Sequence, residues 1–440
     1  MGIEFVGAFE STYQPAHDVD VAESTGHAAA WADDLELLRG CGVRRLRYPI
    51  RWHRVEASPG EYDWAATDAA LGFLADREMT PIVDLVHHTS YPRWLTGGFA
   101  DPRFSDAYLR YCEAFARRYR DTVAYTLFNE PFATLFLAGC EGLWPPYHRG
   151  TEAFVAMLRN VLPAFGEAVR LYRDLLPGAA HVYVDTCERH SDDGSDAGSQ
   201  YAAFANDRRF FVLDAMLGRP FTPDRPFVAA VVAAGGEDLL DLEPAPVDVL
   251  GLDYYAHSQW HFAAEAGVTP SPVPRTLAAL IVEYWERYQT PCMLSETNIR
   301  GFPSDRATWL KYTLEQCELA QEAGVALDGY CWFPFVDSCD WDSLLYYCDG
   351  NVDPVGVYWL DDTLARRPSS MSRAYAAAAA GASAADLPAY LLRPPVSQWL
   401  AGYAEQMSHW DWQPPPADER HREDVDVDVV FELRIRDALQ

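Results

Sequence analysis

The chain has 440 residues, of which 49% are hydrophobic and 13% aromatic, so it carries enough apolar material to bury a large core. Its 65 acidic and 35 basic residues give a formal net charge of −30 at pH 7, which repels phosphate backbones and anionic lipid headgroups. Nucleic acids and membranes are therefore poor partners, and no run of about 18 apolar residues predicts a transmembrane helix.

The cysteine pattern and the first residues both favour the cytoplasm. The nine cysteines are scattered, odd in number and without a C-x-x-C pair, as expected for reduced thiols rather than for a disulfide framework or a zinc site. The opening stretch MGIEFVGAFEST lacks the basic segment, apolar run and cleavage site of a signal peptide. We expect a cytoplasmic protein without metal or other cofactor, and a homo-oligomer stays open.

From the N-terminus onwards, short β-branched or aromatic runs alternate with helical patterns. The expected strands begin at Ile3, Val43, Pro81, Val123, His181, Val247, Pro291 and Leu327. Helical patterns between them begin at His27, Asp106, Thr151 and Thr308. Eight strands that alternate with helices over about 380 residues predict an α/β fold, a (β/α)8 TIM barrel with inserted loops. The rival is a doubly wound sheet, but no glycine-rich nucleotide-binding motif follows any of these strands.

Two regions depart from this alternation. The stretch ERHSDDGSDAGSQ, which starts at Glu188, is predicted to be an exposed loop because of its Ser, Asp and Gly content. After a barrel of residues 1–380 we expect a C-terminal extension of residues 381–440, partly helical or irregular. Its last stretch, REDVDVDVVFELRIRD, alternates apolar and charged residues as a half-exposed strand does, whereas disorder is an equal alternative for the polar PPPADERHRED.

Two glutamates occupy the positions where a barrel places catalytic side chains, at the carboxyl ends of strands. Glu130 follows the fourth expected strand in YTLFNEPF, and Glu296 follows the seventh in PCMLSETN. Taken alone, Glu130 is explained equally well by a solvated Asn-Glu-Pro turn. Two carboxyl groups across one cleft are the equipment for glycoside hydrolysis, and a retaining mechanism requires them about 5 to 5.5 Å apart. The pair therefore predicts a glycosidase.

Several further segments, in the same order, resemble glycoside hydrolase family 1, the β-glucosidase and β-galactosidase family of retaining (β/α)8 enzymes. These segments are VRRLRYPIRWHRVEASPGEYDW, FANDRRFFVLDAMLGRPF, VLGLDYYAHSQW, GYCWFPFVDSCDW and VGVYWLDDTLARRPSSMSRAY. The likeness runs from Ile3 to about Ala380 and leaves the C-terminal extension outside. It implies a catalytic barrel that hydrolyses small β-glucosides or β-galactosides by double displacement, as a retaining β-glycosidase without cofactor.

The resemblance also implies a role for each matching residue. Glu130 would be the general acid/base and Glu296 the nucleophile, while Asn129 would bind the sugar 2-hydroxyl. Arg47 and Tyr255 would flank Glu296, where a guanidinium and a phenol donor favour the ionised carboxylate. The remaining sugar-binding positions would be His87, Trp332, Glu10, Asp340 and Trp341.

Some of these positions depart from the family pattern. Glu10 stands where the family usually has Gln, Asp340 where it commonly has Glu, and His88 where it has Trp after the histidine, so the glycone stays open. The acidic eighth-strand loop disfavours 6-phospho-sugars. Three alternatives remain: a transglycosidase that uses the same two glutamates, a catalytically silent sugar-binding barrel, and a metal-dependent hydrolase. The metal ligands would be His87, His88, Asp84 and His190, although this cluster lacks zincin spacing.

Overall fold

The structure is a computed structural model that describes residues 2–417. Within this range, eight parallel strands form a closed barrel in the order β1-β13-β12-β9-β7-β6-β5-β4. The barrel strands are β1 (Glu4–Ala8), β4 (Arg45–Pro49), β5 (Thr80–Asp84), β6 (Ala124–Thr126), β7 (Ala180–Thr186), β9 (Val249–Asp253), β12 (Cys292–Glu296) and β13 (Leu327–Cys331). Each falls on one of the expected runs, so the (β/α)8 prediction is confirmed.

Helices of very different length connect and cover the strands. The longer ones are α2 (His27–Gly40), α4 (Ala65–Asp76), α5 (Phe104–Arg118), α7 (Thr151–Leu175), α8 (Asp196–Arg208), α11 (Leu277–Tyr288), α12 (Pro303–Glu322) and α13 (Ser370–Ala379). The shorter ones are α1 (Val21–Ser24), α3 (Trp52–Val55), α6 (Pro131–Gly139), α9 (Phe211–Met216), α10 (Pro226–Ala233), α14 (Val396–Trp399), η1 (Gly98–Ala100), η2 (Glu237–Asp241), η3 (Ser343–Tyr347), η4 (Ala384–Asp386) and η5 (Ala401–Tyr403). Among the described residues, no helix is long and apolar enough to cross a membrane.

Short strands outside the barrel lie in the connecting loops and in the C-terminal segment. They are β2 (Tyr13–Gln14), β3 (Val19–Asp20), β8 (Arg189–Asp192), β10 (Gln259–Ala263), β11 (Gly267–Pro270), β14 (Trp359–Leu360), β15 (Arg366–Arg367), β16 (Ala389–Tyr390) and β17 (Trp412–Gln413). Most pair locally, as β2 does with β3 and β10 with β11 in antiparallel hairpins. These hairpins lengthen the loops between the barrel elements.

The described chain packs as two compact units. The first consists of residues 2–10, 21–47 and 251–417, and the second of residues 11–20 and 48–250. The division expected from the sequence, with a barrel through residue 380 and an extension from 381, is a different one and stays a prediction.

In the first unit, β1 lies between β13 and β4 in parallel register. Val6 pairs with Cys331 on one side and with Arg45 on the other. Gly7 has no side chain where α2 packs against this strand, and a Cβ there would lie only 2.3 Å from Cδ2 of Leu38. Glycine at this position therefore sets how closely α2 approaches the barrel wall.

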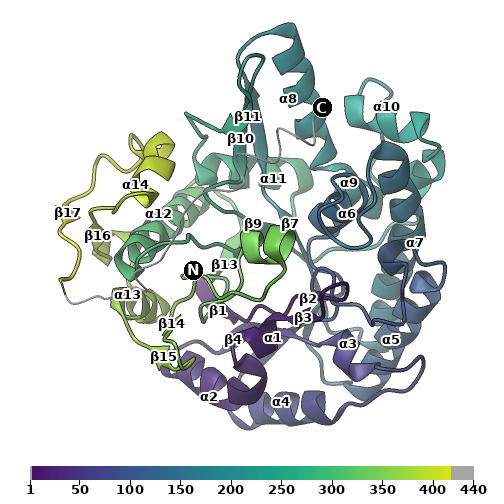
Figure 1. The fold of residues 1–440 in the computed structure, drawn as a ribbon, viewed down its shortest axis with the longest axis horizontal. Coiled ribbons are helices and arrows are strands. Elements are labelled where there is room, and N and C mark those ends of the chain that lie inside the picture. The colour runs from purple at the N-terminus through teal and green to yellow at the C-terminus, as the bar shows by residue number, and fades with distance from the viewer. Residues whose placement is uncertain (1, 418–440) are drawn as a thin grey trace. The chain divides into compact units, whose positions relative to one another are not determined.

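In the second unit, α5 and α7 lie side by side (Figure 1). Their contact is mainly apolar. The hydroxyl of Tyr172 in α7 is hydrogen-bonded, because it donates to the carbonyl of Cys112 in α5 at 3.0 Å. Tyr111 of α5 stacks on Trp52 with ring centroids 4.9 Å apart. Tyr172 also lies edge-on to Tyr125 of β6, with centroids 4.7 Å apart, so large buried aromatic side chains hold α7 against this strand.

The prediction of an exposed loop from Glu188 is wrong for most of this stretch, which forms β8 and the start of α8. Ser195 caps α8, since its Oγ accepts from the N–H of Gly198 at 3.0 Å. Gly194 precedes it with φ of 78°, a left-handed conformation that suits glycine. The residues that suggested a loop therefore make a tight turn and a helix cap.

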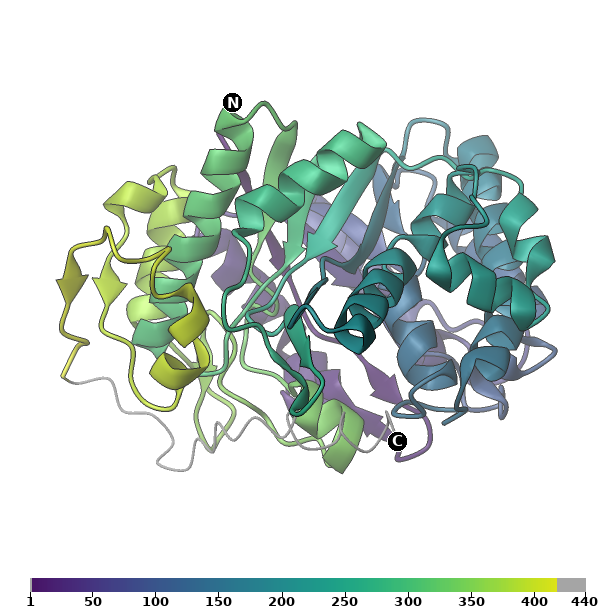
Figure 2. The same cartoon turned by 90° about the horizontal axis from the view of Figure 1, so that it is seen from above.

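The C-terminal segment of residues 381–417 lies against α12, as the yellow ribbon in Figure 2 shows. The ammonium group of Lys311 donates to the carbonyl groups of Ala384 (2.6 Å) and Leu387 (3.0 Å). Tyr312 donates to Oε1 of Gln406 at 2.6 Å. This part of the expected extension is folded onto the barrel's helices, and the expected final strand REDVDVDVVFELRIRD lies outside the described residues.

Candidate active site

Glu130 lies where a buried strand turns into a helix. Beyond β6, the N–H of Asn129 donates to Val86 (2.9 Å) and the N–H of Glu130 donates to Val184 (3.0 Å), so the barrel ladder continues past the strand. Pro131 then begins α6, at a position where the missing N–H of proline costs nothing. Glu130 is fully buried and has φ of 45°, which is rare for a non-glycine residue. The solvated-turn alternative is therefore wrong.

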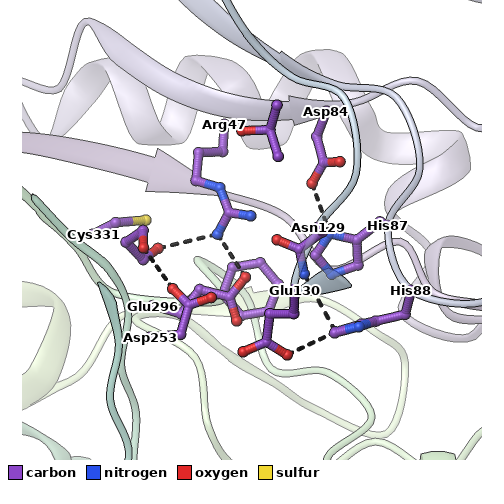
Figure 3. Close-up of polar contacts among 12 residues, drawn as sticks. Arg47, Asp84, His87, His88, Asn129, Glu130, Asp253, Glu296 and Cys331 are labelled. Carbon is purple, nitrogen blue, oxygen red and sulfur yellow. Dashed lines mark hydrogen bonds and ion pairs between the residues drawn. The ribbon is translucent and has the colours of Figure 1, made fainter. Parts of the chain in front are cut away.

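His88 contacts the carboxyl group of Glu130 (Figure 3). Its Nε2 lies 3.8 Å from Oε2 of Glu130, and its Nδ1 hydrogen-bonds Oγ1 of Thr134 in the first turn of α6 at 2.9 Å. The amide of Asn129 lies 3.5 Å from the same Nε2. The departure from the family pattern at position 88 thus places a buried imidazole directly beside Glu130.

Asp185, at the end of β7, holds the start of α6 and was not expected from the sequence. Its carboxyl oxygens accept from the N–H groups of Phe132 (2.8 Å) and Ala133 (3.3 Å) and from the hydroxyl of Tyr183 (2.8 Å). A carboxylate at a helix N-terminus satisfies amides that have no partner within the helix. Asp185 therefore fixes the turn that carries Glu130, and its position at a strand end was the available signal.

Burial raises the pKa of Asp185 to about 6, although its hydrogen-bond donors oppose this shift. Because the folded protein then binds the proton more tightly than the unfolded chain, this group's contribution to the free energy of unfolding falls as pH rises from about 4 to 6. We expect Asp185→Asn, which stays neutral, to lose this dependence. Chemical denaturation of both proteins should show the variant gaining about 1 kcal/mol relative to wild type between pH 5 and pH 7. A difference that is constant with pH would contradict this.

Glu296 ends β12 and is held by one donor on each carboxyl oxygen. The guanidinium of Arg47 donates to Oε1 at 2.6 Å (Figure 3). The hydroxyl of Tyr255 donates to Oε2 at 2.7 Å. All three side chains are buried. Arg47 also donates to the carbonyl of Ser295 at 3.1 Å, so it fixes both the backbone and the side chain at this strand end. The structure thus brings together three of the residues expected at the site.

Two neighbours of Glu296 form supporting contacts. Ser295 donates to Oδ1 of Asp253, the last residue of β9, at 2.6 Å. Asn298 donates to the carbonyl of Phe333 at 2.8 Å and so has a loop-stabilising role. Asp253 was missed by the sequence analysis, although it ends a strand next to β12 in the barrel order.

The other expected sugar-binding residues have defined surroundings, and their roles stay predictions. His87 bonds Oδ2 of Asp84 through Nδ1 at 2.8 Å. Glu10 is buried two residues beyond the end of β1. Trp332 is fully buried, and its indole N–H donates to the carbonyl of Val355 at 2.8 Å.

Asp340 belongs to an ionic cluster around Arg300 that the sequence did not suggest. Arg300 donates to Oδ2 of Asp340 (3.1 Å) and to Oδ2 of Asp342 (3.0 Å), and lies 3.6 Å from Oδ1 of Asp353. Burial raises the pKa of Asp353 to about 6 despite this cation. The adjacent Trp341 ring lies edge-on to Tyr255, with centroids 6.5 Å apart.

A closed (β/α)8 barrel with one buried glutamate after β6 and another at the end of β12 has the architecture of a barrel glycosidase. The family model described as glycosyl hydrolase family 1 matches residues 8–261, and the chain belongs to this family. It is therefore an O-glycoside hydrolase of the retaining β-glycosidase class.

Curated relatives are distant but match over most of their length. Beta-glucosidase A of Thermotoga maritima is 21% identical over 377 residues, which cover 78% of this chain and 83% of that protein. A bifunctional β-D-glucosidase/β-D-fucosidase of Bifidobacterium breve is 27% identical, with 73% of this chain and 81% of that protein covered. Among solved structures, the T. maritima β-glucosidase in complex with deoxynojirimycin superposes with a TM-score of 0.69 at 18% identity, covering 86% of this chain and 97% of that one.

Proposed function

We propose that the protein hydrolyses small β-glucosides by double displacement, with Glu296 as the nucleophile and Glu130 as the general acid/base. The observation that supports this best is the setting of Glu296, which ends a barrel strand with Arg47 on one carboxyl oxygen and Tyr255 on the other. These two donors orient the carboxylate, and each oxygen keeps a second lone pair, through which one of them can bond the anomeric carbon once the sugar is bound.

In the first half-reaction, Glu130 protonates the glycosidic oxygen while Glu296 bonds the anomeric carbon, and the alcohol leaves. In the second, Glu130 takes a proton from water, the water oxygen bonds the anomeric carbon, and the bond to Glu296 breaks. The first step requires a protonated Glu130, and the second requires it to be ionised. The mechanism requires the two carboxyl groups to lie about 5 to 5.5 Å apart.

For the sugar, Asn129 would bind the 2-hydroxyl, and the expected subsite residues would take the other hydroxyls and the apolar face. These residues are His87, Trp332, Glu10, Asp340 and Trp341. Glucosides are the first choice because relatives from both organisms are named as glucosidases. A phosphorylated sugar is disfavoured, since three carboxylates surround Arg300 and give this cluster a net negative charge.

We also propose that the protein works in the cytoplasm. All nine cysteines lie within the described residues and are free thiols, and eight of them are buried. Free thiols persist in a reducing compartment. Determination of the thiol content of protein purified from its native cells should therefore give nine thiols per chain, and a disulfide would contradict this.

The proposed reaction is tested with a panel of nitrophenyl β-glycosides and an activated 2-fluoro-glucoside that slows release of the sugar from the enzyme. We expect the glucoside to be cleaved fastest, and peptide mass spectrometry to find the fluorosugar attached to Glu296. A label on another residue would refute the assignment of the nucleophile. Loss of activity with a chelator would instead favour the metal-dependent alternative, and sugar transfer to an added alcohol in preference to water would favour a transglycosidase.

A further inference from the structure

The C-terminal segment of residues 381–417, which lies beyond the family match at 8–261, reaches the loop that carries Tyr255. Tyr403, at the end of η5, is buried. Its hydroxyl donates to the carbonyl of Ala256 at 2.9 Å and lies 2.9 Å from the hydroxyl of Tyr254. One side chain from the end of the chain thus contacts the residues on both sides of Tyr255.

These hydroxyl groups form a directed chain of hydrogen bonds. The amide of Gln259 donates to the hydroxyl oxygen of Tyr254 at 2.8 Å. Because the Tyr403 proton goes to Ala256, Tyr254 must donate its own proton to Tyr403. Each hydroxyl then donates once and accepts once, so removal of either one leaves buried polar groups without partners.

The chain of hydrogen bonds bears directly on the surroundings of Glu296. The N–H of Tyr254 donates to the carbonyl of Glu296 at 2.9 Å, while the hydroxyl of Tyr255 donates to its side chain. Tyr403 therefore holds Tyr254 and Ala256. Between these two residues lies Tyr255, whose hydroxyl orients the carboxylate of Glu296.

The ring of Tyr403 makes a second connection to the same strand end. It packs edge-on against Trp309 of α12, with centroids 5.4 Å apart. The indole N–H of Trp309 in turn donates to Oγ1 of Thr297 at 3.0 Å, directly after Glu296. Tyr403 thus contacts the Tyr254–Ala256 turn directly and reaches Thr297 through Trp309.

A second aromatic contact with the same segment, made through His257, supports the Tyr255 ring itself. His257 stacks on Tyr255 with centroids 5.3 Å apart, and Trp399 of α14 lies 5.9 Å from His257. Burial lowers the pKa of His257 to about 4, so the imidazole is neutral at neutral pH and packs as an uncharged ring. The C-terminal segment therefore contacts the Tyr255 loop at two separate places.

We propose that Tyr403 is a positioning residue for the reaction, which holds the Tyr254–Ala256 turn so that the hydroxyl of Tyr255 stays on Glu296. This inference rests on the proposed function of Glu296 as the nucleophile. It makes the C-terminal segment part of the active-site architecture, although no side chain of this segment has to touch the substrate.

A double-mutant cycle with Tyr255 tests the inference in the full-length protein. Activity on a nitrophenyl β-glucoside is divided by the number of active sites, which is titrated with the activated 2-fluoro-glucoside. We expect Tyr403→Phe to lower kcat/KM per active site by about tenfold, which is about 1.4 kcal/mol. In the Tyr255→Phe background the same change should cost less than about twofold, because the residue that it positions has already lost its hydroxyl.

Trp410→Phe is the matched control, since it removes a hydrogen bond of the same segment to Glu315 (3.1 Å), away from the Tyr255 loop. It should leave the activity per active site unchanged. An equal loss from Tyr403→Phe in both backgrounds, or no loss in either, would overturn the inference. If Tyr403→Phe does not fold, Tyr254→Phe breaks the same chain of hydrogen bonds and is judged by the same criteria. Full activity of Glu296→Ala would instead refute the proposed function, whatever the cycle shows.

Discussion

Replacement of Glu296 by alanine is expected to lower kcat/KM for aryl β-glucosides by about 10⁴-fold or more, because the covalent route is lost. Added azide should restore cleavage of a dinitrophenyl glucoside by occupying the vacated space. Since azide then attacks from the side where the carboxylate stood, the product should be the α-glucosyl azide. The anomeric configuration of this product, determined by NMR, distinguishes loss of the nucleophile from general damage to the site.

Glu130→Ala should behave differently with the same substrates. Loss of the general acid costs about 10²- to 10⁴-fold for a poor leaving group but little for dinitrophenolate, which leaves without protonation. Azide should then attack the glucosyl group on Glu296 and give the β-glucosyl azide. Glu113→Ala, which removes an exposed partner of Arg117, is the control and should leave activity unchanged. Identical azide products from both active-site variants would refute the division of roles.

The positions of the reacting groups could be predicted because they follow from barrel periodicity. Glu296 and Tyr255 lie at or just after the ends of β12 and β9, which are neighbours in the barrel. Parallel strands bring their carboxyl ends to one rim, so residues at expected strand ends meet there. Arg47, in β4, reaches the same carboxylate because its side chain is long and points into the barrel end.

The loop contacts could not be predicted in this way. Arg300 meets Asp340, Asp342 and Asp353 through two loops whose conformations leave no periodic signal in the sequence. Tyr403 reaches Tyr254 across a separation of 149 residues, and no local pattern encodes such a contact. The same holds for β8 and α8, where the turn-forming residues that predict a loop instead serve as a helix cap.

Asp337→Ala is expected to have the largest effect on stability, with the free energy of unfolding lowered by about 3 to 5 kcal/mol. Asp337 is buried after β13, where Oδ1 accepts from Arg306 (2.8 Å) and Gly356 N–H (2.8 Å), and Oδ2 accepts from Leu360 N–H (3.0 Å). Arg306 is fully buried. Loss of the carboxylate therefore leaves a buried guanidinium uncompensated and two amides without acceptors. Chemical denaturation measures the change.

A second substitution separates the charge from the amide contacts. Asp337→Ala combined with Arg306→Met removes the uncompensated cation, so the double variant should be more stable than Asp337→Ala alone. The control is Asp238→Ala, whose partner Arg159 is 2.9 Å away, with both side chains more than half exposed, and it should cost at most about 1 kcal/mol. If Asp337→Ala cost no more than this control, the buried pair would contribute nothing to stability. A double variant less stable than Asp337→Ala would show that Arg306 acts through its hydrogen bond to Gly356 rather than through its charge.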